Sequence, residues 1–121
     1  MKDLTMDKNQ LEWFREIGDS ADLNDIQRYV AEVLALRGFG GESPRDKMLL
    51  LLEEVGELAK AVRKQATTLG VDVAKAGNYD TAESEAADVF IILLSLCNVM
   101  GINLYRAFLD KEEANLKRKW G

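Results

Sequence analysis

The sequence predicts an all-α fold with a four-helix-bundle-like core and an extra short helix at the N-terminus. Apolar residues recur at spacings of three and four over most of the chain, whereas the alternating β-branched residues typical of strands are scarce. The 121 residues also contain only one proline. This length and a hydrophobic content of 47% suit one domain with one modest core. We therefore expect a single domain over residues 1–121, with an N-terminal extension over 1–21 and a core over 22–120.

The first two helices are predicted on either side of Gly18. Residues 6–17 carry a cluster of large apolar side chains, and Gly18 is a suitable helix end. Asp22 can cap the second helix, which continues until the glycine-rich stretch 37–41. This stretch lacks the lysine and the preceding strand of a phosphate-binding loop, so we interpret it as a turn.

The third helix has the clearest predicted start. Ser43 can act as the cap, Pro44 fits the first turn because its missing N–H has no helical partner there, and Asp46 stands three residues after the cap. We expect this helix to reach about Gln65. Residues 67–79 contain two glycines and an asparagine, which predicts a connecting loop.

Two further helices are predicted after that loop. Asp80 with Glu83 resembles a capping pair, and the apolar helix that follows should run to about Met100. Asn103 can then cap a last helix that reaches Leu116. The helix ending near Met100 is apolar on nearly all sides, which predicts burial on several faces and favours assembly into an oligomer.

The composition excludes several classes of function. A net charge of −5 disfavours nucleic-acid binding, which normally uses a concentrated basic face. No uninterrupted apolar stretch is long enough to predict a membrane span, and the first residues lack the apolar segment of a secretory signal, so we expect a cytoplasmic protein. There is no histidine, and the single cysteine, Cys97, lies in an apolar run that predicts a buried thiol. Any bound metal would therefore have oxygen ligands, which favours Mg²⁺ or Mn²⁺.

Four carboxylates are predicted to come together between two helices. On the third helix Glu54 and Glu57 fall on the flank of an apolar stripe, while Glu53 points further round. On the fourth helix the apolar face extends backwards to Asp88 and Glu85. The two apolar stripes are formed by Leu51, Val55, Leu58 and Val62 and by Val89, Ile92, Leu96 and Val99.

Antiparallel packing of these helices would bring the four acids to a shared place. Like charges at close range repel strongly unless a divalent cation lies among them, so convergence implies a metal site with Glu54, Glu57, Glu85 and Asp88 as ligands. The alternatives are a solvated acidic face, or acids that simply favour the positive end of a helix.

The same residues resemble a known family. Residues 52–59, Leu-Glu-Glu-Val-Gly-Glu-Leu-Ala, followed by Glu85-Ala-Ala-Asp88, are similar to the pattern E-E-x-x-E then E-x-x-D of the MazG-type all-α nucleoside triphosphate pyrophosphohydrolases. The likeness continues through residues 96–104 and the pattern Lys111-x-x-x-Asn115-x-x-Arg118. It covers roughly residues 23–119.

The resemblance implies Mg²⁺-dependent hydrolysis of a (deoxy)nucleoside triphosphate to a nucleoside monophosphate and pyrophosphate, in nucleotide-pool house-cleaning. It makes Glu54, Glu57, Glu85 and Asp88 metal ligands, and Glu53 a base or water-orienting residue. It also implies a homodimer or homotetramer. Related all-α enzymes act on dUTP or phosphoribosyl-ATP, and the motif leaves those substrates open.

The last helix supplies candidate substrate-binding residues. Lys111, Asn115 and Arg118 share one face and could contact phosphates or the base, although basic residues also suit an ordinary helix end. Two other functions stay open. A non-enzymatic helical interaction module would need no metal, and a carboxylate-bridged redox protein would usually contain histidine ligands.

Overall fold

The computed structural model describes residues 8–66 and 81–121, and within these ranges the chain forms five helices and no strand. This confirms the all-α prediction. The predicted loop over 67–79 lies outside the described residues. The helices are α1 (Gln10–Ile17), α2 (Leu23–Leu36), α3 (Pro44–Ala66), α4 (Ala82–Val99) and α5 (Leu104–Leu116).

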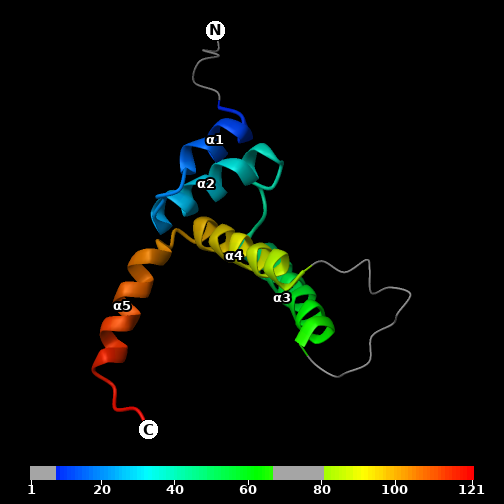
Figure 1. Ribbon diagram of the computed structural model, residues 1–121. Helices are drawn as coiled ribbons and strands as arrows, with labels where there is room; N and C mark the ends of the chain where they lie inside the picture. The colour runs from blue at the N-terminus through cyan, green and yellow to red at the C-terminus, as the bar shows by residue number, and fades with distance from the viewer. Residues whose placement is uncertain (1–7, 67–80) are drawn as a thin grey trace.

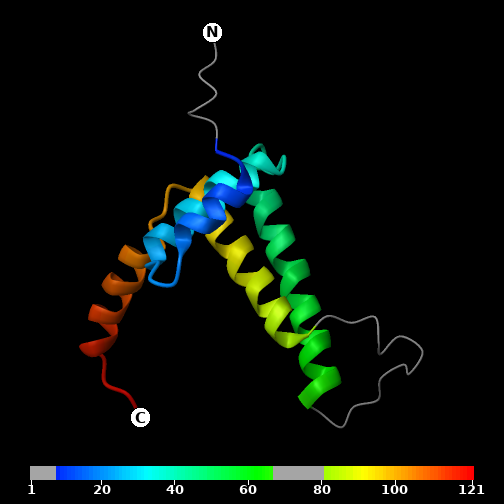
Figure 2. The same cartoon turned by 45° about the horizontal axis from the view of Figure 1, so that its top comes forward.

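The helices are arranged as two packed pairs and one arm (Figures 1 and 2). α3 and α4 lie side by side, α1 packs on α2, and this second pair lies across one end of the first. The first residues of α5 contact α2, and the rest of α5 leads away from the other helices. The axes of α4 and α5 differ by 96° at the turn between them. No described helix by itself has the length and apolar character of a membrane span; only the bent α4–α5 pair, taken together, meets that test.

Side-chain caps decide where all five described helices begin. The predicted cap of α3 is confirmed, because the Asp46 amide donates a hydrogen bond to the Ser43 hydroxyl at 3.2 Å. Asp22 accepts a hydrogen bond from the Asp25 amide and Asn103 accepts one from the Arg106 amide, which confirms both predicted caps. The predicted start of the first helix at residue 6 was wrong. Asn9 has an extended backbone and forms a capping box with Glu12, so the helix begins only at residue 10.

The cap of α4 is one residue later than predicted. The Thr81 hydroxyl accepts a hydrogen bond from the Ser84 amide at 3.1 Å and is the helix cap. Asp80, which the sequence suggested for this role, lies outside the described residues. Both residues can act as caps, so spacing alone did not separate them.

The apolar core lies mainly between α2 and α4. Val30 and Leu34 of α2 pack with Leu94 of α4, which is completely buried. Cys97 is also buried, as predicted, and burial raises the pKa of its thiol. α4 meets α3 on one side and α2 on another, which explains why it is apolar almost all round.

The face of α3 that packs toward the body of the protein matches the predicted stripe only in part, at Leu51 and Leu58, which are half-buried. Lys47 and Ala61 are the buried residues of α3, and Glu54 stands between them at seven-residue spacing. Val55 and Val62, predicted as core, are 45% and 42% exposed. α3 carries apolar side chains over more than half of its circumference, so the pattern did not reveal which stripe would be covered within one chain.

Candidate metal centre

Helix geometry places one acid of α3 opposite two acids of α4. Glu54 lies on the inward face of α3, at seven-residue spacing from Lys47 and Ala61. Glu85 and Asp88 stand three positions apart in the first half of α4, so they project from the same side of that helix. Because α3 and α4 pack along each other, the three side chains meet between them.

The three carboxylates are close enough to share one ion. Glu54, Glu85 and Asp88 each offer an oxygen, and these oxygens all lie within 4.8 Å of one another. Glu85 is only 5% exposed, while Glu54 and Asp88 are half-buried. A carboxylate as deeply buried as that of Glu85 is uncommon in proteins, and here it lies beside two further carboxylates.

The electrostatics of the cluster disfavour the ionised form of Glu54. Its pKa is raised above the ordinary value of 4.5, first by burial and then by the negative charges of Asp88, Glu57 and Glu53. The charges therefore oppose one another in the absence of a cation. A divalent ion would reverse the sign of this interaction, because it binds the ionised carboxylates.

The donor set suits a hard divalent cation. All three side chains offer carboxylate oxygens, which are the ligands that Mg²⁺ and Mn²⁺ prefer, and the chain has no histidine that would favour zinc or copper. Three acids from two rigid helices also leave room for substrate or water oxygens around an ion. The residues present thus fit the metal that the sequence predicted.

The remaining predicted acids lie at the edge of this cluster. Glu57 is exposed on α3, and its carboxylate lies 3.5 Å from the Lys60 ammonium. Glu53 is also exposed. Both acids nevertheless lie close enough to raise the pKa of Glu54. The structure thus brings three of the four predicted ligands together and places Glu57 beside them, turned toward a lysine.

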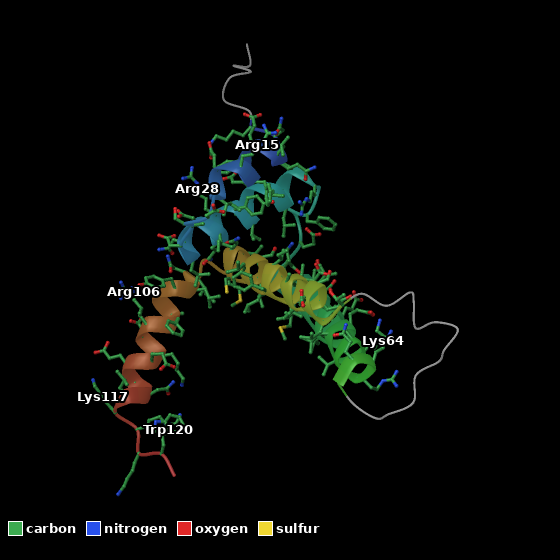
Figure 3. All side chains as sticks on the ribbon, viewed as in Figure 1. Arg15, Arg28, Lys64, Arg106, Lys117 and Trp120 are labelled. Carbon is green, nitrogen blue, oxygen red and sulfur yellow. The ribbon has the colours of Figure 1, made fainter. Side chains whose placement is uncertain are left out.

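The predicted substrate-binding residues lie on the α5 arm. The Asn115 amide donates a hydrogen bond to Glu112, and the Arg118 guanidinium lies 4.4 Å from the centre of the Trp120 ring. Lys111 is exposed. Figure 3 shows Lys117 and Trp120 at the far end of this arm, well away from Lys64 at the end of α3. Within one chain, the predicted substrate-binding residues are therefore separate from the carboxylate cluster.

Sequence reasoning missed one charged residue on the inward face of α3. Lys47 is 1% exposed; its ammonium donates a hydrogen bond to the Phe39 carbonyl at 2.9 Å and lies 3.7 Å from Glu42. These contacts fasten the turn before α3. Its seven-residue spacing from Glu54 was visible in the sequence, but a lysine at a helix start is ordinarily exposed.

Comparisons with known proteins found one family and two curated relatives that are similar to this chain. The profile of the MazG nucleotide pyrophosphohydrolase domain matches residues 42–116, more than half of the chain, and this range contains all of the predicted metal ligands. dCTP pyrophosphatase 1 of Rattus norvegicus and its counterpart of Mus musculus are each 33% identical to the chain over 98 residues. Each match covers 79% of this chain and 58% of the relative, so the chain spans less than two thirds of their length.

Proposed function

Since this chain belongs to the MazG nucleotide pyrophosphohydrolase family, we propose that it hydrolyses a nucleoside triphosphate between the α and β phosphates. Water is the second reactant, and the products are a nucleoside monophosphate and pyrophosphate. The observation that supports this most strongly is the approach of the Glu54, Glu85 and Asp88 oxygens to within 4.8 Å of one another.

Magnesium is the proposed cofactor, and Mn²⁺ could replace it because it accepts the same oxygen donors. Glu54, Glu85 and Asp88 would hold it, with Glu57 as the fourth ligand. A divalent ion supplies positive charge against the phosphate oxygens and lowers the pKa of water. Glu57 would have to leave the lysine that it now faces, and an exposed side chain can do this at little cost.

The carboxylates of α3 are the proposed proton acceptors. The chain has no histidine, so an acid must accept the proton that the attacking water loses. We assign this role, or that of orienting the water, to Glu53, which is exposed next to Glu54 and open to solvent. Breakage of the bond between the α and β phosphates then lets pyrophosphate leave with the bridging oxygen.

Lys111, Asn115 and Arg118 are the proposed substrate-binding residues. Two of them carry positive charge that suits phosphate oxygens, and Asn115 offers an amide. Because the arm leads away from α3 and α4 (Figure 2), we propose that it serves the metal site of a neighbouring copy. The active unit is then a homodimer or a homotetramer.

An exposed apolar stripe on α3 supports this assembly. Met48, Leu52, Val55 and Val62 are between 42% and 56% exposed, and they follow one another at the spacings that line one side of a helix. Contiguous apolar surface of this kind commonly marks an interface between proteins. A second copy could cover it, because a stripe on one helix can pack against the same stripe of its twin.

The similarity to dCTP pyrophosphatases makes dCTP the first substrate to test. Other deoxynucleotides follow, for which we propose a role in cleaning the cytoplasmic nucleotide pool, and dUTP and phosphoribosyl-ATP are the alternative substrates to test. We propose no nucleic-acid or membrane partner, since the chain is acidic.

The decisive experiment measures both phosphate products. The purified protein is incubated with a panel of nucleoside triphosphates and Mg²⁺, and pyrophosphate and orthophosphate are quantified separately with and without chelator. We expect pyrophosphate only, and only with metal. Release of orthophosphate alone would contradict the proposed bond cleavage, and turnover in excess chelator would contradict the metal site.

The same assay separates the enzyme from a helical interaction module. Such a module would show no turnover with any nucleotide, and its thermal melting temperature would not depend on Mg²⁺. In the proposed enzyme, Mg²⁺ binds the carboxylates of the folded state and not those of the unfolded chain. The melting temperature should therefore rise with the Mg²⁺ concentration, by an amount that depends on the affinity. A melting temperature unaffected by Mg²⁺, together with inactivity, would favour the module.

A further inference from the structure

The bend between α4 and α5 is held by the side chain of one buried glutamine. Gln27 of α2 is 8% exposed. Its amide nitrogen donates to the Asn98 side chain at 3.0 Å and to the Ile102 carbonyl at 2.7 Å. Its amide oxygen accepts a hydrogen bond from the Leu104 backbone N–H at 3.0 Å. One side chain therefore contacts the end of α4, the turn and the first residue of α5.

Backbone and neighbouring contacts complete this junction. The Asn98 amide donates to the Gln27 carbonyl at 3.2 Å, and Asn103 donates to Asn24 at 2.9 Å. Gly101 has φ +68°, which closes the turn. These side-chain amides bond mainly to one another and to the backbone, so they hold α2, α4 and α5 together at the junction.

Little else determines the direction of α5. Leu104 packs against the core at the root of the arm, and beyond it the arm leads away from the other described helices. At 1.5 Å per residue, Leu116 stands about 18 Å along α5 from Leu104, so a tilt of about 10° at the root would move the end of the helix by about 3 Å. Misplacement of a substrate-positioning group by about 1 Å can already lower the rate of an enzyme strongly.

We propose that Gln27 is a positioning residue, which aims the substrate-binding side chains of α5 by clamping the α4–α5 bend. The inference rests on the proposed pyrophosphohydrolase function and on the role of Lys111 and Arg118 in it. Gln27 itself touches neither substrate nor metal. Its loss therefore weakens substrate binding and leaves the carboxylate cluster in place.

The first test needs no turnover. Spin labels at Ala87→Cys on α4 and at Lys117→Cys, the residue that caps the end of α5, report the distance between the two helices. Labelled protein is diluted into unlabelled protein so that label pairs within one chain dominate the signal. Cys97 is buried and should label slowly. We expect a narrow distance distribution that broadens in Gln27→Met. An equally narrow distribution at the same distance in Gln27→Met would overturn the clamp.

The second test is a double-mutant cycle in the pyrophosphate assay. Gln27→Met should raise KM by about tenfold with kcat nearly unchanged, because uniform binding is lost. In the Lys111→Ala/Arg118→Ala background the same change should alter KM by less than about twofold, since the groups that Gln27 aims are gone. An equal rise in both backgrounds, or a fall in kcat alone, would overturn the inference.

The matched control is Val33→Ala, which removes a buried side chain of α2 outside the junction. It should lower the melting temperature without changing KM. If KM rises in Val33→Ala as much as in Gln27→Met, loss of stability alone explains the effect, and Gln27 is not a positioning residue. If the wild-type chain releases no pyrophosphate, the proposed function fails, whereas the spin-label distances still decide whether Gln27 clamps the bend.

Discussion

The α3–α4 pair and the α5 arm carry opposite charges of the candidate site and are held in place differently. α3 and α4 pack along their lengths, so Glu54, Glu85 and Asp88 approach one another between two rigid helices. Among the described residues, those that hold α5 lie near its root, where Gln27 and Leu104 contact α2, α4 and the turn. The acids are thus assembled within one chain, whereas the basic residues are presented outward.

This difference matches the tasks proposed for the two regions. A metal ion requires ligands placed to within a fraction of an ångström, and packed helices provide that precision. A nucleotide extends well beyond the ion, so residues that contact its far end can come from another copy. This separation is the reason for our proposal that the complete site is formed by two copies of the chain.

The largest effect is expected when one acid of the cluster between α3 and α4 is removed. Asp88→Asn should lower kcat by a factor on the order of 10³ or more, because the charge that retains the metal is lost. The protein should stay folded, since repulsion with Glu54 is relieved. Steady-state pyrophosphate release and circular dichroism check both points. Asp110→Asn, an exposed acid of α5, is the control and should retain wild-type activity; substantial turnover in Asp88→Asn would reject its role as a ligand.

Mixing two impaired variants, assayed at a substrate concentration well below the raised KM of the arm variant, tests whether the arm serves another copy. Asp88→Asn retains its arm, and Lys111→Ala/Arg118→Ala retains its acids. If subunits exchange freely in a dimer, half of the dimers are mixed and one site of each is intact, so about a quarter of wild-type activity should return. Recovery is measured after co-refolding of equal amounts. No recovery from demonstrated mixed dimers would place the arm and the acids of each site in the same chain.

The apolar stripe of α3 can be tested by introducing one charge. Leu52 is 56% exposed, and Leu52→Glu would bury an unpaired carboxylate if a second copy covers it. We expect light scattering to show a smaller species, or a dissociation constant raised by at least about tenfold. Ala31→Glu, at an exposed position of α2, should leave the mass unchanged. An unaltered mass in both variants would exclude this stripe as the interface.

The smallest effect expected is a change of stability with pH in the metal-free protein. The raised pKa of Glu54 means that the folded state binds its proton more tightly than the unfolded chain. The free energy of unfolding should therefore fall as pH rises from 4.5 through the raised value, and level off above it. Urea titrations in chelator measure this, and Glu54→Gln should reduce the slope. With Mg²⁺ present the trend should weaken or reverse, because the ion binds the ionised form; an unchanged slope in Glu54→Gln would assign the effect to other groups.

Much of the fold and site could be predicted because helical signals are local. Asp22 and Asn103 bond to backbone amides three residues away, so the sequence indicated these caps directly. The three-residue spacing of Glu85 and Asp88 likewise places both acids on one side of a helix regardless of its surroundings. The motif around Glu54 and Glu57 then indicated the family.

Only the tertiary structure decided which faces meet. It covered the stripe of Lys47 and Ala61 rather than that of Val55 and Val62, and it sent α5 away from the acids. Local spacing determines what lies on each side of a helix, because backbone geometry sets it at every turn. The choice among several apolar sides depends on the neighbouring helices, and contacts such as those of Gln27 with residues more than 70 positions away leave no periodic signal in the sequence.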